Sequence, residues 1–285
     1  MKRIVSISLL MFCLPFFLFA QSASSGNGGQ RADGYEYVDL GLSVKWATCN
    51  VGASSPEEFG GYYQWAGTRD VTSTNIKLDW DNCPYHTGAD RSSGWTKYVT
   101  SNKSSYWSGR GNPDNKTVLD PGDDVAQVRR GGKWRIPTET EWEELQDCCT
   151  WTRTTQNGVE GIKVTSKKSG YTNRSIFLPV TGYRSSNSLL SGFNFISNDG
   201  CYWSSSCASD TPSASCFIIQ LPVTSSSKAS RWSGGCVRYY GMSVRPVYGD
   251  PINVTGVSLD KTRINLNVGA TYTLKATVTP SNAPD

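Results

Sequence analysis

The sequence has little of what metal sites and hydrolytic sites need. It contains one histidine, His86, and none of its cysteines shows the C-x-x-C spacing of structural zinc sites. We therefore expect no structural zinc site. Because His86 stands alone in a Gly/Asp-rich stretch, Ser/His-type nucleophilic catalysis has no support either. We expect His86 to be a solvated loop residue.

Charge of either sign is also sparse. Charged residues make up 18% of the chain, and its net charge is +4. Lys2 and Arg3 supply two of those positive charges, so the chain beyond residue 20 carries about +2. A balance this close to neutrality argues against nucleic acid and against an anionic membrane surface as partners.

Long apolar runs are absent except at the amino terminus. There Lys2 and Arg3 precede an apolar run over residues 4–19 that ends at Ala20. A charged start, an apolar stretch of this length and a small final residue predict an export signal over residues 1–20. The run is shorter than the ~20 residues of a membrane span, although a retained anchor is the alternative. We expect an exported protein (secreted, periplasmic or on the cell surface) that meets the membrane only through this signal.

Cysteine is present in moderate number. Nine cysteines occur in the chain, and eight of them lie beyond residue 20. An even count in an exported protein permits disulfides, but the sequence cannot choose among the pairings. A chain this long can build its own core, so we expect a disulfide or two rather than a full framework.

The chain divides by composition into a linker and a main domain. Residues 21–34 are rich in Ser, Gly and Asn, which predicts a flexible linker. Short apolar runs typical of strands recur through residues 35–249. They cover 37–40, 42–46, 61–66, 161–165, 175–179, 201–204, 216–221 and 242–247. Residues 67–118 are the least regular part, and their spaced aromatic residues indicate ordering by packing.

One helix is clearly predicted, over residues 139–147. Thr138 is a good N-cap, and Glu141 three residues later completes a capping box. Trp142 and Leu145 fall on one face, while Glu139 and Glu144 are expected in water. One helix among many short strands predicts an α+β fold with an antiparallel sheet.

Residues 250–285 change character. Val257 and Leu259, and later Tyr272 and Leu274, belong to runs that alternate strictly between apolar and polar residues. This pattern predicts strands of a second, sandwich-type domain. The segment is far shorter than the ~100 residues of such a domain. We therefore expect a truncated Ig-like module that cannot close its own core.

Five motifs of the main domain resemble a known family. They are Val38-Asp-Leu-Gly-Leu-Ser-Val-Lys-Trp46, Tyr62-Tyr-Gln-Trp65, Gly132-Lys-Trp-Arg-Ile-Pro-Thr138, Tyr202-Trp-Ser-Ser-Ser206 and Gly241-Met-Ser-Val-Arg-Pro-Val247. As an ordered set over residues 35 to 248 they resemble the Fibrobacter succinogenes major paralogous domain family of exported bacterial proteins. The resemblance implies a C-type-lectin-like fold with long ligand-facing loops. Residues 254–285 resemble the start of a bacterial Ig-like domain of group 2, a module common on adhesins.

An enzymatic alternative comes from the same fold. Residues 134–142 are similar to the helix motif of formylglycine-generating enzymes, which use two cysteines five positions apart near the carboxyl end. Cys236 lies in a comparable stretch, but position 241 is a glycine, so the second cysteine is missing. Since a shared fold does not carry activity with it, we expect no enzyme and rank a degenerate oxidase last.

An acidic turn is the candidate metal site. Asp120, Asp123 and Asp124 place three carboxylates close together, and calcium prefers such oxygen ligands. The alternative is a solvated turn in which Asp123 or Asp124 caps the following segment. The calcium-binding triplets of lectins, Glu-Pro-Asn, Gln-Pro-Asp and Trp-Asn-Asp, do not occur. We expect no cofactor, and calcium is the one ion that this turn could hold.

The loops around 80–110 and 205–240 are the candidate binding region. Tyr, Trp and Arg anchor interfaces, and aromatic faces stack on sugars. The candidate ligand-binding residues are Trp95, Trp107, Asp210, Arg231, Trp232, Arg238, Tyr239 and Tyr240. The alternative is ordinary strand and loop, and we place Trp203 in the core. The composition of residues 199–240 is also compatible with adenine-targeted diversification of this stretch, as in some lectin-fold proteins.

We therefore expect an exported or cell-surface recognition module that binds a glycan or a surface protein. The alternative is a structural component of a surface assembly or stalk, without a small ligand. The sequence leaves the ligand, the disulfide pairs and the oligomeric state open.

Overall fold

The computed structural model describes residues 30–73, 75–88, 93–185, 188–190, 199–208, 213–219, 230–231, 235–251, 256–265 and 271–279. The predicted export signal lies outside these ranges, as does most of the predicted linker. Within them, no helix is long and apolar enough to cross a membrane.

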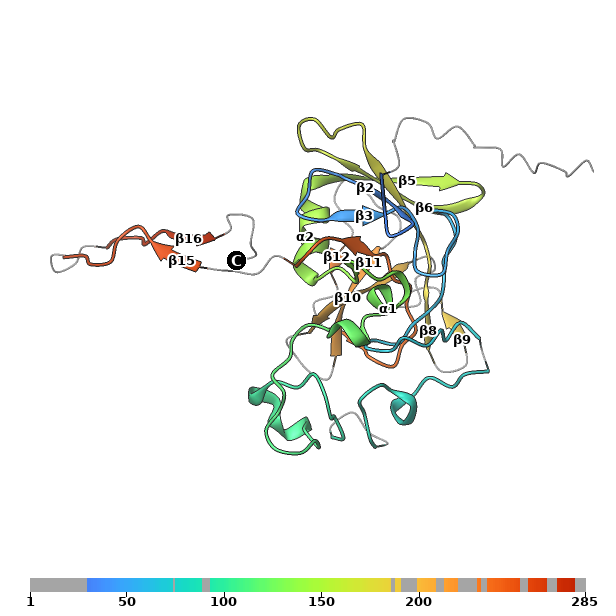
Figure 1. Ribbon diagram of the computed structural model, residues 1–285, viewed down its shortest axis with the longest axis horizontal. Coiled ribbons are helices and arrows are strands. Elements are labelled where there is room, and N and C mark those ends of the chain that lie inside the picture. Colours follow the sequence, from blue (N-terminus) through green and yellow to red (C-terminus); the bar gives the residue numbers. More distant parts are fainter. Residues whose placement is uncertain are drawn as a thin grey trace, which may run out of the picture.

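The described chain is mainly antiparallel β structure with few helices, which confirms the α+β class (Figure 1). The strands of the main body are β1 (Gln30–Ala32), β2 (Tyr35–Val38), β3 (Lys45–Ala47), β4 (Trp134–Arg135), β5 (Cys149–Gln156), β6 (Val159–Ser166), β7 (Ser175–Pro179), β8 (Tyr183–Ser185), β9 (Ser188–Leu190), β10 (Gly200–Cys207), β11 (Ser213–Ile219), β12 (Ser230–Arg231), β13 (Cys236–Val237) and β14 (Val247–Tyr248). The helices are α1 (Val125–Arg130), α2 (Glu139–Cys148) and the short 3-10 helices η1 (Trp80–Asn82), η2 (Ser101–Tyr106) and η3 (Pro121–Asp123).

Strands from both ends of the main domain meet in one sheet. Its order is β1-β2-β3-β14-β4, so β14 lies between β3 and β4 although it is the last of them in sequence. A second sheet holds β5-β6-β7, and a third joins β10 and β11 to β12 and β13. The first sheet thus brings residues 30–47 and residues 247–248 together.

The predicted helix is α2, and its capping box is present. The Thr138 hydroxyl accepts from the Glu141 amide, and the Glu141 carboxylate accepts from the Thr138 amide. Trp142 and Leu145 are buried, as their spacing predicts. Glu144, expected in water, instead accepts hydrogen bonds from Ser43 on a distant loop. The helix is thus tied to the first sheet by its outer face as well as by its apolar face.

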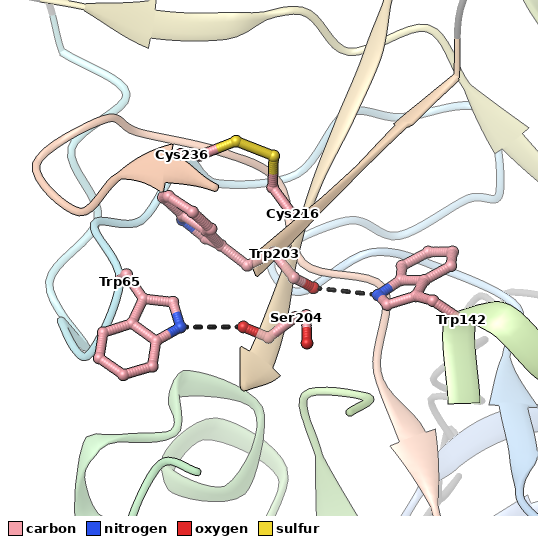
Figure 2. Close-up of a disulfide and its surroundings, with 6 residues drawn as sticks. All are labelled: Trp65, Trp142, Trp203, Ser204, Cys216 and Cys236. Carbon is pink, nitrogen blue, oxygen red and sulfur yellow. Dashed lines mark hydrogen bonds between the residues drawn. A yellow bond between two sulfur atoms is a disulfide. The ribbon is translucent and has the colours of Figure 1, made fainter. Parts of the chain in front are cut away.

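Tryptophans fix strand β10 from two sides. The Trp65 indole donates to the Ser204 carbonyl at 2.9 Å, and the Trp142 indole donates to the Trp203 carbonyl at 3.2 Å (Figure 2). Trp203 itself is completely buried, as predicted. Burying several indoles contributes much of the apolar stabilisation, and their N–H groups need the carbonyl partners that this strand supplies.

One disulfide, Cys216–Cys236, joins β11 to β13 beside Trp203 (Figure 2). Both of its cysteines are buried, and β11 and β13 are also paired at Ala214 and Cys236. The cross-link therefore reinforces a backbone contact in the core. It agrees with the expectation of a disulfide or two.

Several sequence-based boundaries differ from the structure. Residues 30–34, predicted as linker, form β1 and the turn into β2. Residues 61–66, predicted as a strand, contribute only a bridge from Tyr63 to Met242. The first error arises because a polar composition hides the hairpin between residues 30–32 and 35–37, and the second because Tyr63 pairs only with the distant Met242. Residues 67–118 contain no strand longer than isolated bridges in their described part, as their irregular composition predicts.

The described part of the carboxyl-terminal segment forms a two-stranded antiparallel sheet of β15 (Gly256–Leu259) and β16 (Ala276–Thr279). Figure 1 shows it apart from the other sheets. Leu259, Tyr272 and Leu274 have exposed fractions of 50%, 44% and 46%. Such exposure is what strands without a complete core would show. The assignment to a truncated Ig-like module stays a prediction.

Candidate functional site

Two segments far apart in the sequence meet in one aromatic cluster. Its buried centre is Cys83, Trp95 and Val99. Four half-buried residues pack around that centre, and we call them the aromatic patch: Trp80, Tyr106, Trp107 and Tyr239. Trp80 meets Tyr239 edge-on, with ring centroids 4.8 Å apart, so the patch joins the 80–107 segment to the segment after β13. The irregular segment lies along the lower side of the molecule in Figure 1.

The 93–111 segment is folded back on itself by its own hydrogen bonds. The Trp95 amide donates to the Tyr106 carbonyl at 3.1 Å, and the Ser108 amide donates to the Trp95 carbonyl at 2.8 Å. The Trp107 indole donates to the Gly111 carbonyl at 3.0 Å. These contacts hold the Trp107 ring in place with part of its surface in solvent. An irregular backbone thus presents aromatic side chains in a fixed arrangement.

A buried arginine lies beneath the patch. The Arg238 guanidinium is 4.5 Å from the Trp65 ring and 4.7 Å from the Trp95 ring. It also donates to the Tyr98 carbonyl at 3.1 Å. Burial lowers the pKa of Arg238, but two aromatic faces and a carbonyl compensate its charge. Arg238 therefore supports the patch from below.

Asp123 is the centre of a polar network under the same segment. Its carboxylate accepts from the Tyr85 and Tyr98 hydroxyls, both at 2.5 Å. The Lys97 ammonium lies 2.5 Å from Asp123 and 2.6 Å from Asp120. Burial tends to raise the pKa of Asp123, but hydrogen bonds from Lys97 and the two tyrosines hold it below its ordinary value.

Asp124 belongs to a different environment. It is the N-cap of α1, accepting from the Ala126 and Gln127 amides, and it also accepts from the Ile136 amide. Burial raises the pKa of Asp124 to about 6, against the effect of those three hydrogen bonds. Capping by Asp124 is the alternative weighed for the acidic turn, and the structure shows it.

The acidic turn does not gather its carboxylates around one point. Asp120 faces Lys97 and Lys116, Asp123 faces Lys97 and two tyrosines, and Asp124 caps a helix. No group of three or more potential metal ligands lies together among the described residues. The residues as they stand fit a calcium ion poorly, since the oxygens that it would need already bind the chain's own donors.

His86 is buried rather than solvated, which corrects the expectation from its polar neighbours. Its exposed fraction is 7%, and its Nδ1 lies 3.0 Å from the Trp80 carbonyl oxygen. Its ring packs 4.6 Å from the Trp95 ring. The aromatic cluster encloses it because Trp80 and Trp95 approach from both sides, which the local sequence does not reveal. His86 thus belongs to the support of the patch.

The structure sorts the predicted binding residues into three groups. Trp107, Tyr239 and Tyr240 are half-buried and offer surface. Trp95 and Arg238, expected on loops, have exposed fractions of 0% and 1%, so neither can contact a ligand without leaving the interior. The Arg238 guanidinium packs on the Trp95 ring, so neither group is available at the surface.

Three further candidates cannot be placed by their side chains. Arg231 lies in β12, where its backbone pairs with Phe217, and only its backbone is described. Asp210 and Trp232 lie outside the described residues, as does much of the stretch considered for diversification.

Sequence reasoning included Trp80, Tyr106 and Lys97 in the candidate loops around 80–110 but did not single them out as site residues. Trp80 stands among the spaced aromatics of an irregular segment, which is the signal that could have singled it out. Lys97 carries no such signal, because its two carboxylate partners lie more than twenty residues away in sequence.

The hypothesis of a degenerate oxidase depends on the thiol of Cys236. Cys236 is bonded to Cys216 in the core and does not face a free thiol across a cleft.

Elsewhere a cavity of about 300 Å³ opens between η3, the start of α2 and the residues after β14. Its walls include Leu119, Ile136 and Pro251, and Lys133 and Asp250 form an exposed ion pair among its lining residues. Asp124 of the acidic turn also lines it, whereas none of the candidate ligand-binding residues does.

Comparison with protein-family models, curated proteins and solved structures finds no match for this chain.

Proposed function

We propose that this chain is an exported recognition module that binds a glycan by stacking sugar rings on the aromatic patch. The observation that carries the proposal is the meeting of Trp80, Tyr106, Trp107 and Tyr239, all half-buried, in one cluster. Aromatic rings with a free face bind the apolar face of a sugar, and rigid support lowers the entropy lost on binding. A surface protein with matching apolar groups is the alternative ligand.

The surroundings of the patch suit such recognition. Exposed polar groups lie beside it on η1, where Asp81 and Asn82 are exposed and Asp79 pairs with Lys77. Hydrogen bonds from such groups to sugar hydroxyls would orient a ring stacked on Trp80. Arg238 and the buried Trp95 hold the platform in place from below.

The fold and the location belong to the same proposal. A C-type-lectin-like domain, as the resemblance implies, would present its long loops to a ligand in this way. The predicted signal over residues 1–20 would deliver it outside the cytoplasm, where the Cys216–Cys236 disulfide could form. We propose no catalytic role, because the second cysteine of the oxidase pattern is absent.

A glycan array tests the proposal. We expect the mature chain to bind a defined sugar class, and Trp107→Ala or Tyr239→Ala to weaken that binding by about 5- to 150-fold, since one stacking partner contributes about 1–3 kcal/mol by analogy with base stacking. Tyr171→Ala is the matched control, because Tyr171 is a half-buried aromatic paired with Arg174 away from the patch. Equal binding by all variants would contradict the proposal.

A second candidate function, a structural role in a surface assembly, is favoured by the exposed apolar residues of the β15–β16 segment. Exposed apolar patches mark contacts with other proteins. A folded chain that binds no glycan and self-associates in sedimentation measurements would support this role over the first.

A further inference from the structure

The 93–118 segment contributes Tyr106 and Trp107 to the aromatic patch and Lys97 to an ion cluster with Asp120 and Asp123. Lys97 is two residues from the buried Trp95, and its side chain is only 22% exposed. Its ammonium lies 4.9 Å from the centroids of both the Tyr85 and Tyr98 rings. The charge of Lys97 is therefore enclosed by two aromatic rings and two carboxylates.

The position of this ammonium is the one that a metal ion would need. Lys97 Nζ lies 2.6 Å from Asp120 Oδ2 and 2.5 Å from Asp123 Oδ2. Calcium binds carboxylate oxygens at about 2.3–2.6 Å, so a calcium ion shared by these two oxygens would occupy the space of the ammonium. Lysine and metal exclude each other there.

The carboxylates that Lys97 holds are connected to the backbone of the segment. The Tyr98 hydroxyl donates to Asp123 and accepts from the Asp120 amide at 2.9 Å. The Tyr98 and Val99 amides donate to Asp114, at 2.9 and 3.0 Å. The ion pairs of Lys97 thus hold the carboxylates of Asp120 and Asp123, which Tyr98 connects to the backbone of the segment.

We infer that Lys97 is the resident cation of this segment: it positions the aromatic patch and makes ligand binding there independent of calcium. This inference deepens the proposed function and rests on it for the ligand, whereas the ordering of the segment by Lys97 does not depend on any ligand. Lys97 is a positioning residue, since it supports the patch through Trp95 and Tyr98 without reaching its surface. The internal ammonium of Lys97 takes the place that calcium, the candidate ion of the acidic turn, would occupy.

The test compares Lys97→Gln with Lys116→Gln in the mature full-length chain. Lys116 is the matched control, because it pairs with Asp120 alone and its side chain is 43% exposed. Hydrogen exchange is followed at the Trp95, Tyr98 and Asn115 amides, which are hydrogen-bonded within the segment. We expect protection to fall at least about tenfold in Lys97→Gln and to change little in Lys116→Gln.

Calcium supplies the second arm, with calcium chloride as the probe. We expect neither millimolar calcium nor a chelator to change the melting temperature or the exchange of the wild-type segment. A rise in melting temperature with calcium would overturn the inference, and so would unchanged protection in Lys97→Gln. If Lys97→Gln does not fold, Asp120→Asn, which removes one of the two carboxylates, carries the exchange test in its place.

These readouts separate the inference from the proposed function. A silent glycan array with protection lost in Lys97→Gln would leave Lys97 as the organiser of the segment and remove only the glycan. Full glycan binding by a Lys97→Gln chain that has lost protection would contradict the positioning of the patch by Lys97.

Discussion

At the scale of single residues, this chain places ionised groups in its interior and compensates each by a different means. Arg238 lies between two indole rings, and Arg245 donates to the Ala47 and Thr48 carbonyls. Asp123 binds an ammonium and two hydroxyls, whereas Asp124 receives three backbone amides. Because an uncompensated buried charge is costly, each of these groups fixes the segments that supply its partners.

The buried carboxyl of Asp124 predicts a pH dependence of stability. Its folded pKa of about 6 lies above its ordinary value, so the native state binds the proton more tightly than the unfolded state. The resulting contribution to stability is fully present below about pH 4 and is lost as the pH rises through about 6.

The measurement is urea unfolding of the wild type and of Asp124→Asn between about pH 4 and pH 7. Asparagine keeps an N-cap oxygen but does not titrate. We expect the wild type to lose stability relative to the variant with rising pH, by up to about 1.4 kcal/mol per unit. If the unfolding free energy of the wild type minus that of the variant stays constant or increases with rising pH, burial does not control this carboxyl.

At the scale of elements, local signals and distant contacts decide different parts of the fold. The helix α2 is predictable because Thr138, Glu141 and Trp142 lie within one and a half turns. Strand β7 is predicted with its bounds because Ser175–Pro179 is a short buried apolar run. The candidate site is less predictable. Arg238 and Tyr98 are 140 residues apart in sequence, and no local pattern brings them together.

The difference between local pattern and tertiary contact also explains why only some of the predicted binding residues are exposed. Tyr239 and Trp107 have the right residue type and also lie at the surface of the cluster. Trp95 has the right type, but the packing of Trp80, His86 and Arg238 around it uses every face. Residue type predicts membership of an aromatic cluster, whereas only the tertiary arrangement decides which members remain exposed.

The capping box of α2 gives a prediction for an element. Thr138→Ala removes the hydroxyl that accepts from the Glu141 amide, and it should cost about 1 kcal/mol of unfolding free energy. Thr138→Ser keeps the hydroxyl and should stay near the wild type. Chemical denaturation of the three proteins checks the order, and equal stability of the alanine and wild-type chains would show that this cap contributes nothing.

At the scale of the whole molecule, one cross-link lies within the sheet of β10 and β11, and indole hydrogen bonds attach β10 to segments outside that sheet. The disulfide closes a sequence separation of 20 residues within the region that carries the strands β11, β12 and β13. Trp65 and Trp142 tie β10 to the loop before the irregular segment and to α2. The platform under the aromatic patch therefore depends on contacts spread over the entire domain.

Removing the disulfide should destabilise the whole domain. We expect the double variant Cys216→Ala, Cys236→Ala to lose about 3 kcal/mol, mainly because its unfolded chain is less constrained. Cys148→Ala, at a half-buried free cysteine, is the control and should change little. Thermal unfolding with and without a reducing agent checks this: a wild type insensitive to reduction would contradict a stabilising cross-link.

The central claim is that the aromatic patch is the surface that meets a ligand, and hydroxyl-radical footprinting tests it directly. The mature chain is labelled alone and with a pool of soluble xylan, mannan and β-glucan. We predict slower oxidation of Trp80, Tyr106, Trp107 and Tyr239 in the presence of the pool, with Tyr171 unchanged. Protection confined to residues outside the patch, or no protection by any glycan of the pool, would contradict the account.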